Sequence, residues 1–130
     1  MILVDTHVVV WLALDPKQIS RKARAAIDAA RGNAQGLAIS DITLLELATL
    51  VAKGRVALRA SLESFLEEIE SRFVVLPMNA RSCARVMGLP STFPKDPADR
   101  IITATALVEG IPLITADREI RKSRVLEAIW

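Results

Sequence analysis

The sequence predicts an α/β fold, a three-layer α/β/α sandwich around a mainly parallel central sheet, and three observations predict it. Short apolar runs without polar alternation recur along the chain, which is typical of strands covered on both faces. Segments with apolar residues at three- and four-residue spacing separate these runs, as amphipathic helices do. Strands and helices alternate throughout, the pattern of a parallel sheet between helical layers.

The elements of the first 32 residues follow from one apolar run and two turn signals. The run Met1–Val4 predicts a strand in the centre of the sheet. Residues 6–14 predict a short helix that Asp15-Pro16 ends. Ser20 is a good N-cap for a second helix, which we expect to end at Gly32.

The middle of the chain predicts two further strands and two helices. The second strand is Leu37–Ile39, followed by a helix that begins near Ser40-Asp41 and ends before Gly54. Ser61 opens an amphipathic helix with its glutamates toward solvent. Residues 73–76 predict a third buried strand.

The last third of the chain contains the best-defined helix. Asn79 caps a short helix that ends at Gly88, and a loop with two prolines follows. Residues 97–109 form a helix with Pro just inside its start and Gly just beyond its end. Residues 112–115 predict a fourth strand, and Val125-Leu126 a short edge strand.

Length and composition indicate one soluble domain over residues 1–130. The chain is 52% hydrophobic and 25% charged, and no apolar run reaches the roughly 18 residues of a membrane span, so we expect no membrane association. The apolar start lacks the basic segment and cleavage site of a secretory signal. The one cysteine, Cys83, fits a reducing cytoplasm and is interpreted as a small core residue.

A net charge of +2 is too small to indicate a nucleic-acid partner by itself. Basic residues form three clusters, each of which could simply be a solvated helix face. These clusters are Arg21-Lys22-Arg24, Lys53-Arg55-Arg59 and Arg118-Arg121-Lys122-Arg124. Aromatic residues are too scarce for a platform that stacks single-stranded bases, so phosphate contacts should dominate any such binding.

Acids occur in four places at or just beyond the carboxyl end of a predicted strand. They are Asp5, Glu46, the pair Asp96/Asp99, and Asp117. In open α/β sheets ligands bind outside these strand ends, so the acids have the position of a site.

Each acid also has a structural interpretation. Glu46 follows Thr43 at capping-box spacing, although a helix start at Ser40-Asp41 would place it in the second turn, where burying it is costly without a partner or a metal. Asp96 suits an N-cap, and Asp117 could simply begin a turn. For Asp99, at the start of a core helix, we favour function, and Asp5 has the fewest structural uses.

Converging carboxylates repel one another, and a hard divalent ion offsets that repulsion. Mg²⁺, or Mn²⁺ in its place, prefers oxygen ligands and supports phosphodiester hydrolysis without a covalent intermediate. A phosphate-binding glycine loop is missing, and the single His and single Cys argue against zinc and against a Cys/His nucleophile. His7 is interpreted as a packing or hydrogen-bonding residue near the site.

Four segments together resemble the PIN domain, and more narrowly the VapC-type toxins of bacterial type II toxin–antitoxin modules. They are Met1-Ile2-Leu3-Val4-Asp5-Thr6-His7, Ile39-Ser40 leading to Glu46, the run Lys95 to Ala106 with its D-P-x-D-R-x-I-x-A-x-A pattern, and Leu113-Ile114-Thr115-Ala116-Asp117. The resemblance covers the whole chain.

The resemblance implies a Mg²⁺-dependent endoribonuclease with Asp5 and Asp99 as metal ligands and Glu46 and Asp117 completing the acidic pocket. Asp96 would be an accessory acid or the helix cap. Thr6, Ser40 and Thr115 would lie beside the site and hold water or phosphate. A homodimer and a cognate antitoxin that silences the toxin are also implied, while the basic tail from Arg118 to Trp130 cannot be assigned to RNA by analogy.

Two alternatives remain at this point. A receiver-like signalling module also binds Mg²⁺ with acids at strand ends, but Thr6 stands where it needs a second acid and Asp117 where it needs a lysine. A PIN ribonuclease could instead act in RNA processing. A short upstream reading frame for a DNA-binding antitoxin would favour the toxin.

Overall fold

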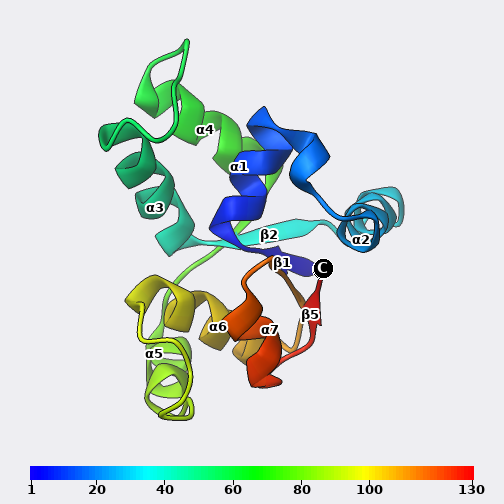
Figure 1. Ribbon diagram of the computed structural model, residues 1–130, viewed down its shortest axis with the longest axis vertical. Helices are drawn as coiled ribbons and strands as arrows, with labels where there is room; N and C mark the ends of the chain where they lie inside the picture. Colours follow the sequence, from blue (N-terminus) through cyan, green and yellow to red (C-terminus); the bar gives the residue numbers. More distant parts are fainter.

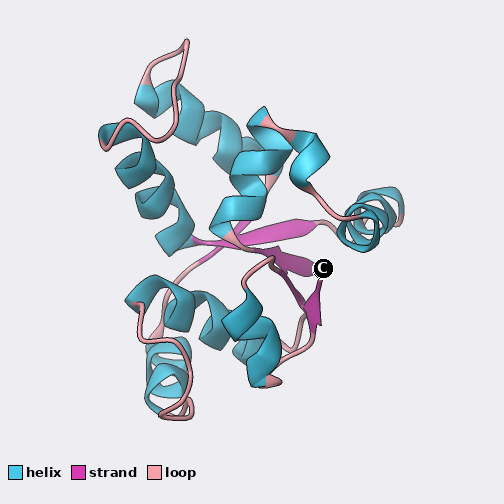
Figure 2. Ribbon diagram, viewed as in Figure 1, coloured by secondary structure: helices cyan, strands magenta, loops and turns pink.

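The computed structural model describes all 130 residues and places a parallel five-stranded sheet between two layers of helices (Figures 1 and 2). The strand order is β3-β2-β1-β4-β5, and every pairing is parallel. The strands are β1 Ile2–Val4, β2 Leu37–Ser40, β3 Val74–Leu76, β4 Leu113–Ile114 and β5 Ala128–Ile129. The predicted three-layer α/β/α sandwich is confirmed.

The helices divide between the two faces of the sheet. Helices α1 Thr6–Leu14, α3 Asp41–Ala52 and α4 Leu62–Arg72 lie above the sheet in Figure 1, with η1 Pro16–Gln18 and α2 Arg21–Gly32 toward the right. Helices α5 Ala80–Met87, α6 Pro97–Glu109 and α7 Arg118–Ser123 lie below it. The predicted N-caps Ser20, Ser61 and Asn79 all accept a backbone N–H.

Alternate residues of the strands pack into two separate hydrophobic cores, one on each face of the sheet. Val4, Ile39 and Ile114 pack with α1 to α4, whereas Leu3 and Leu113 pack with α6 and α7. Successive strand residues point to opposite faces, so a strand covered on both sides must be apolar throughout. This is the physical reason for the unbroken apolar runs in the sequence.

The direction in which the chain adds strands reverses between β1 and β4. From β1 the chain adds β2 and β3 on one side, then crosses to add β4 and β5 on the other. The two central strands pair in register, Leu3 with Leu113 and Val4 with Ile114. Such a reversal opens a crevice at the carboxyl ends of the strands.

Several predictions about elements and burial were wrong. The predicted buried strand over residues 73–76 is the edge strand β3, which begins at Val74, and Val74 is exposed because β3 has a neighbour on one side only. The last strand is β5, pairing with β4, and not Val125-Leu126. Cys83 is exposed and is not a core residue, because it lines an open surface pocket between α5 and α6. Helix α7 and the turn η1 were not predicted.

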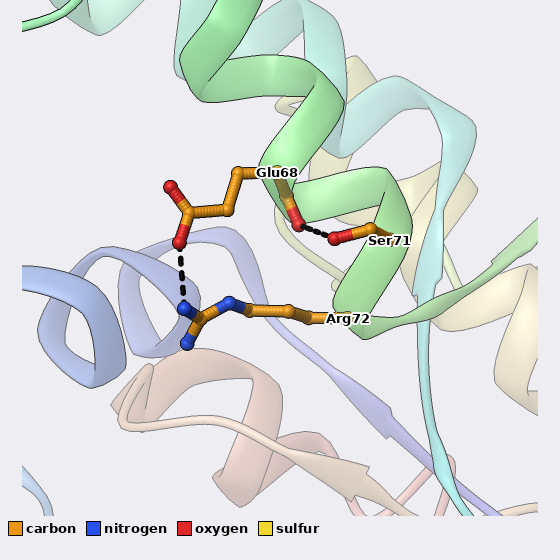
Figure 3. A network of polar contacts seen from close by, with 3 residues as sticks. All are labelled: Glu68, Ser71 and Arg72. Carbon is orange, nitrogen blue, oxygen red and sulfur yellow. Dashed lines mark hydrogen bonds and ion pairs between the residues drawn. The ribbon is translucent and has the colours of Figure 1, made fainter.

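The acidic face of α4 is solvated, as predicted. Glu68 forms a 2.6 Å ion pair with Arg72 one turn later, and its backbone carbonyl accepts a hydrogen bond from the Ser71 hydroxyl (Figure 3). Both charged side chains are exposed, so this pair adds little stability. None of the helices has the length and apolar character that crossing a bilayer requires.

Candidate active site

Asp5 is held rigidly at the carboxyl end of β1. It is the N-cap of α1: its Oδ1 accepts the backbone N–H of Thr6 at 2.8 Å, and its Oδ2 accepts the Thr115 hydroxyl at 2.7 Å. The side chain is buried, and this burial raises its pKa although both hydrogen bonds act in the opposite direction. Asp5 therefore does have a structural use, and it is still an acid that is costly to ionise without a cation.

Glu46 reaches the same place from α3. The N-cap of α3 is Ser40, whose hydroxyl accepts the Ile42 N–H, so Glu46 lies in the second turn and the capping-box interpretation with Thr43 was wrong. Oε1 of Glu46 accepts the Thr6 hydroxyl at 2.5 Å, and that hydroxyl also lies 3.1 Å from the Thr43 hydroxyl. Burial raises the pKa of Glu46, and the negative charge of Asp5 adds to the shift.

The start of α6 supplies two further acids with different roles. Asp96 is the N-cap and accepts the backbone N–H of Asp99 at 3.1 Å, with Pro97 in the first turn. The Asp99 carboxylate accepts no hydrogen bond from the protein. Its pKa is raised from 3.8 to about 7, first by burial and then by the negative charges of four neighbouring carboxylates, in the order Asp5, Asp96, Asp117 and Glu46.

Asp117 begins α7 just beyond β4. Its Oδ1 accepts the N–H groups of Glu119 and Ile120, so it caps a helix and does not merely begin a turn. Its own N–H donates to the Thr115 hydroxyl, which thereby links Asp117 to Asp5. Oδ2 of Asp117 has no hydrogen bond within the protein.

One cavity of about 600 Å³ brings these acids together. Its acidic lining consists of Asp5, Glu46, Asp96, Asp99 and Asp117. Thr6 also lines it. Thr115 and Ser40 do not: Thr115 is buried behind Asp5, and Ser40 is buried as the cap of α3.

Three titratable residues of the cavity were not predicted as site residues from the sequence. His7 is exposed at the cavity, with its ring 6.4 Å from that of Trp11. Lys53 and Arg55, at the end of α3, also line it. Their signal in the sequence is spacing, because Lys53 follows Glu46 by seven residues and so lies on the same helix face two turns later.

The donor set fits a hard divalent ion. Every acidic side chain of the cavity offers carboxylate oxygen, and no donor of the protein hydrogen-bonds to the Asp99 carboxylate. The pKa of Asp99 is raised by burial first and by the surrounding negative charges second, and a cation would offset both. No three of these side chains stand in an arrangement that could enclose a metal ion by themselves. Mg²⁺ typically uses one or two carboxylates and keeps several waters, so this open arrangement suits it.

Comparisons with known proteins concern the family and the fold of this chain. The PIN domain pattern matches residues 2–125. The chain is 36% identical to Ribonuclease VapC22 of Mycobacterium tuberculosis, over 95% of this chain and 92% of the relative. Its fold is similar to VapBC2 from Rickettsia felis, with a TM-score of 0.74, 20% identity, and 98% and 97% of the two chains covered. It is also similar to VapBC from Salmonella typhimurium, with a TM-score of 0.73 and 19% identity, and the match covers 98% of this chain and 95% of that one.

Proposed function

The chain belongs to the PIN-domain family, and from this premise we propose that it is a Mg²⁺-dependent endoribonuclease that hydrolyses RNA phosphodiester bonds as the toxin of a type II toxin–antitoxin module. The name of the relative, Ribonuclease VapC22, supports the ribonuclease activity. The observation that carries the proposal is the set of four carboxylate charges that all act on Asp99 inside one cavity.

Asp5 and Asp99 are the proposed metal ligands. Asp5 is fixed by its two hydrogen bonds, and Asp99 is free of any, so the first provides a rigid ligand and the second an unsatisfied one. When bound, Mg²⁺, or Mn²⁺ in its place, supplies the positive charge that activates a water molecule and stabilises the phosphodiester oxygens. The protein contributes by keeping these oxygens aimed at one cavity.

Glu46 is the proposed proton acceptor. The Thr6 hydroxyl occupies Oε1, which leaves Oε2 without a hydrogen bond and able to take a proton from the attacking water. Burial raises the pKa of Glu46, which makes its carboxylate a stronger base than an exposed glutamate. Asp117, whose Oδ2 has no hydrogen bond within the protein, lines the same cavity and completes the acidic pocket, with Asp96 as an accessory acid that also caps α6.

The proposed partners are the RNA substrate and a cognate antitoxin. The solved relatives from R. felis and S. typhimurium are VapBC complexes, which supports an antitoxin for this chain. We also propose that the protein forms a homodimer and is located in the cytoplasm. Light scattering of the purified protein measures the oligomeric state. Thr6 lines the cavity and could contact phosphate, whereas Thr115 and Ser40 act from behind it.

The receiver-like alternative does not agree with the sheet. Receiver domains have the strand order 2-1-3-4-5, and this chain has 3-2-1-4-5. A PIN ribonuclease of RNA processing would share the site described here. A neighbouring antitoxin gene whose product copurifies with the chain and stops its cleavage would favour the toxin.

Cleavage of a fluorescent single-stranded RNA by the purified chain tests the proposal. We expect cleavage with Mg²⁺, none after chelation with EDTA, and none with Asp99→Asn. Asp28→Asn is the matched control, because Asp28 is an exposed acid of α2 outside the cavity. Metal-independent cleavage, or full activity of Asp99→Asn, would contradict the proposed mechanism.

A further inference from the structure

Two cations share the acidic cavity and pair with none of its acids. Lys53 and Arg55 line the cavity, yet both ion pairs of the structure lie elsewhere, between Arg72 and Glu68 and between Lys122 and Glu119. Neither side chain donates a hydrogen bond to the protein, and both are exposed. Their positive charges are therefore available to a ligand in the cavity.

The backbone fixes the position of these cations. Lys53 is the C-cap of α3, Gly54 has a positive φ of 71°, and the Arg55 N–H donates to the carbonyl of Leu50 at 2.9 Å. Val56 is buried immediately afterwards and anchors the segment. A left-handed φ is natural for glycine and strained for other residues, so Gly54 allows the chain to turn here and keep Arg55 at the cavity.

The line from Glu46 to Lys53 follows one face of α3. Lys53 lies two turns beyond Glu46, about 10.5 Å along the helix axis, and the floor between them is formed by Thr49 and Leu50. At about 3.4 Å per nucleotide along one stacked strand, about three nucleotides cover this distance. The cations and the acids therefore face different phosphates of a strand that occupies the cavity.

A polyanionic substrate needs these cations. Five carboxylates line the cavity, and a divalent ion at Asp5 and Asp99 neutralises only part of their charge. Without these cations, the remaining carboxylates would repel the phosphate groups that lie away from the ion. Lys53 and Arg55 are the two cationic side chains of that lining, and they stand at the end farther along α3.

We infer that Lys53 and Arg55 bind backbone phosphates of single-stranded RNA about three nucleotides from the phosphodiester bond that is cut. This inference rests on the proposed function, because it names how the same cavity positions its substrate. Both residues are positioning residues that act by holding the strand while the acids perform the chemistry. A cation at a helix C-terminus also stabilises the helix, so the test must separate binding from stability.

The experiment measures the salt dependence of RNA binding by fluorescence anisotropy. The probe is a labelled single-stranded RNA of mixed sequence, in KCl without divalent ions, and all proteins carry Asp99→Asn. Each phosphate contact contributes about 0.7 to the slope of log affinity against log salt, so Lys53→Gln with Arg55→Gln should lower the slope by about 1.4. Over a fourfold range of salt, the parent should then lose about sevenfold more affinity than the double variant.

The matched control is Lys17→Gln with Arg31→Gln, which removes the same charge from exposed positions outside the cavity. We expect its slope to equal that of the parent, and Lys53→Arg to preserve the slope. In the cleavage assay with wild-type acids, the Lys53/Arg55 double variant should raise KM and leave kcat nearly unchanged. Thermal unfolding verifies that the variants are folded.

An unchanged slope in the folded Lys53/Arg55 variant overturns the inference, as does an equal loss in the control or a parent that binds no RNA. The nuclease assignment fails separately. A chain that shows the expected slope change but never cleaves RNA with Mg²⁺ would refute the nuclease and retain the RNA-binding cations. Cleavage of RNA with Mg²⁺ together with an unchanged slope would retain the nuclease and refute the RNA-binding role of Lys53 and Arg55.

Discussion

The Thr115 hydroxyl donates a 2.7 Å hydrogen bond to Oδ2 of Asp5, 110 residues earlier in the chain. The same hydroxyl accepts the N–H of Asp117. One side chain at the end of β4 therefore orients the acid at the end of β1 and the acid at the start of α7. This contact lies at the reversal of strand order, where the crevice opens.

Thr115→Val should reduce cleavage and stability together. Valine has the shape of threonine but leaves a buried Asp5 oxygen and the Asp117 N–H without their partner, which costs about 1–3 kcal/mol. We expect a lower kcat and a lower free energy of unfolding in urea. Full activity in this variant would show that Asp5 keeps its orientation without the hydroxyl.

Thr103→Val should have the opposite effect on stability. The Thr103 hydroxyl is buried in α6 and has no hydrogen-bond partner. Replacing it with an apolar group of the same shape removes that cost and should stabilise the protein by about 1 kcal/mol. Urea unfolding measures the gain, and unchanged cleavage makes this variant the matched control for Thr115→Val. A loss of stability would mean that the hydroxyl finds a partner in solution.

Asp5→Asn should abolish cleavage while the fold survives. Asparagine caps a helix about as well as aspartate, so α1 keeps its cap and stability should change by less than about 1 kcal/mol. The variant has lost one anionic metal ligand, so we expect a fall in kcat of at least about a hundredfold. Cleavage and circular dichroism measured on one preparation separate these effects. Retained activity would remove Asp5 from the mechanism.

Asp99→Asn should stabilise the metal-free protein at pH 8 and not at pH 4. Between pH 4 and 7 the folded protein keeps a proton on Asp99 that the unfolded chain has lost, because folding raises this pKa from 3.8 to about 7. Stability therefore falls as the pH rises through this window, and the penalty is constant above it. For a half-buried group, solvent screening reduces the gain from asparagine to the order of 1–2 kcal/mol.

Unfolding in urea at a series of pH values, with EDTA present, measures this difference. The two curves should coincide near pH 4 and separate as the pH approaches 7. Asp28→Asn should follow the wild type throughout. If the stabilities of wild type and Asp99→Asn changed with pH in parallel, ionised Asp99 would not destabilise the folded state.

Mg²⁺ should raise the melting temperature of the wild type more at pH 8 than at pH 5.5. A ligand at a hundred times its Kd stabilises a protein by about 2.7 kcal/mol. Below pH 7 the ion must displace a proton from Asp99, which weakens binding about tenfold per pH unit. Differential scanning fluorimetry measures the shift, which should be small in Asp99→Asn. Equal shifts at both pH values would place the ion elsewhere.

Local sequence signals predicted most of the fold and the five acids. Unbroken apolar runs located β1 and β2, and the Pro and Gly boundaries located α6. Helix α7 escaped prediction because Arg118–Ser123 contains one apolar residue, Ile120, too few for a periodic pattern. Strand β5 has two residues and exists because β4 offers it an open edge.

The remaining features of the site depend on contacts between distant segments. The Thr6 hydroxyl bonds to Glu46 across 40 positions, and this contact, not a capping box, positions the glutamate. The exposure of Cys83 depends on how closely α5 and α6 pack around the surface pocket that it lines. Spacing within one segment contains no information about either contact.

Helix α3 runs without a break from Glu46 to its C-cap, Lys53, and therefore holds these two residues at a fixed spacing. Helix geometry, and not the flexibility of a loop, sets the interval between Glu46, the proposed proton acceptor, and Lys53, the proposed phosphate-binding residue. Deleting one residue between them would rotate Lys53 by about 100° around the helix and out of line with the strand. The distance between the anchored nucleotide and the new RNA end should therefore be the same on every substrate.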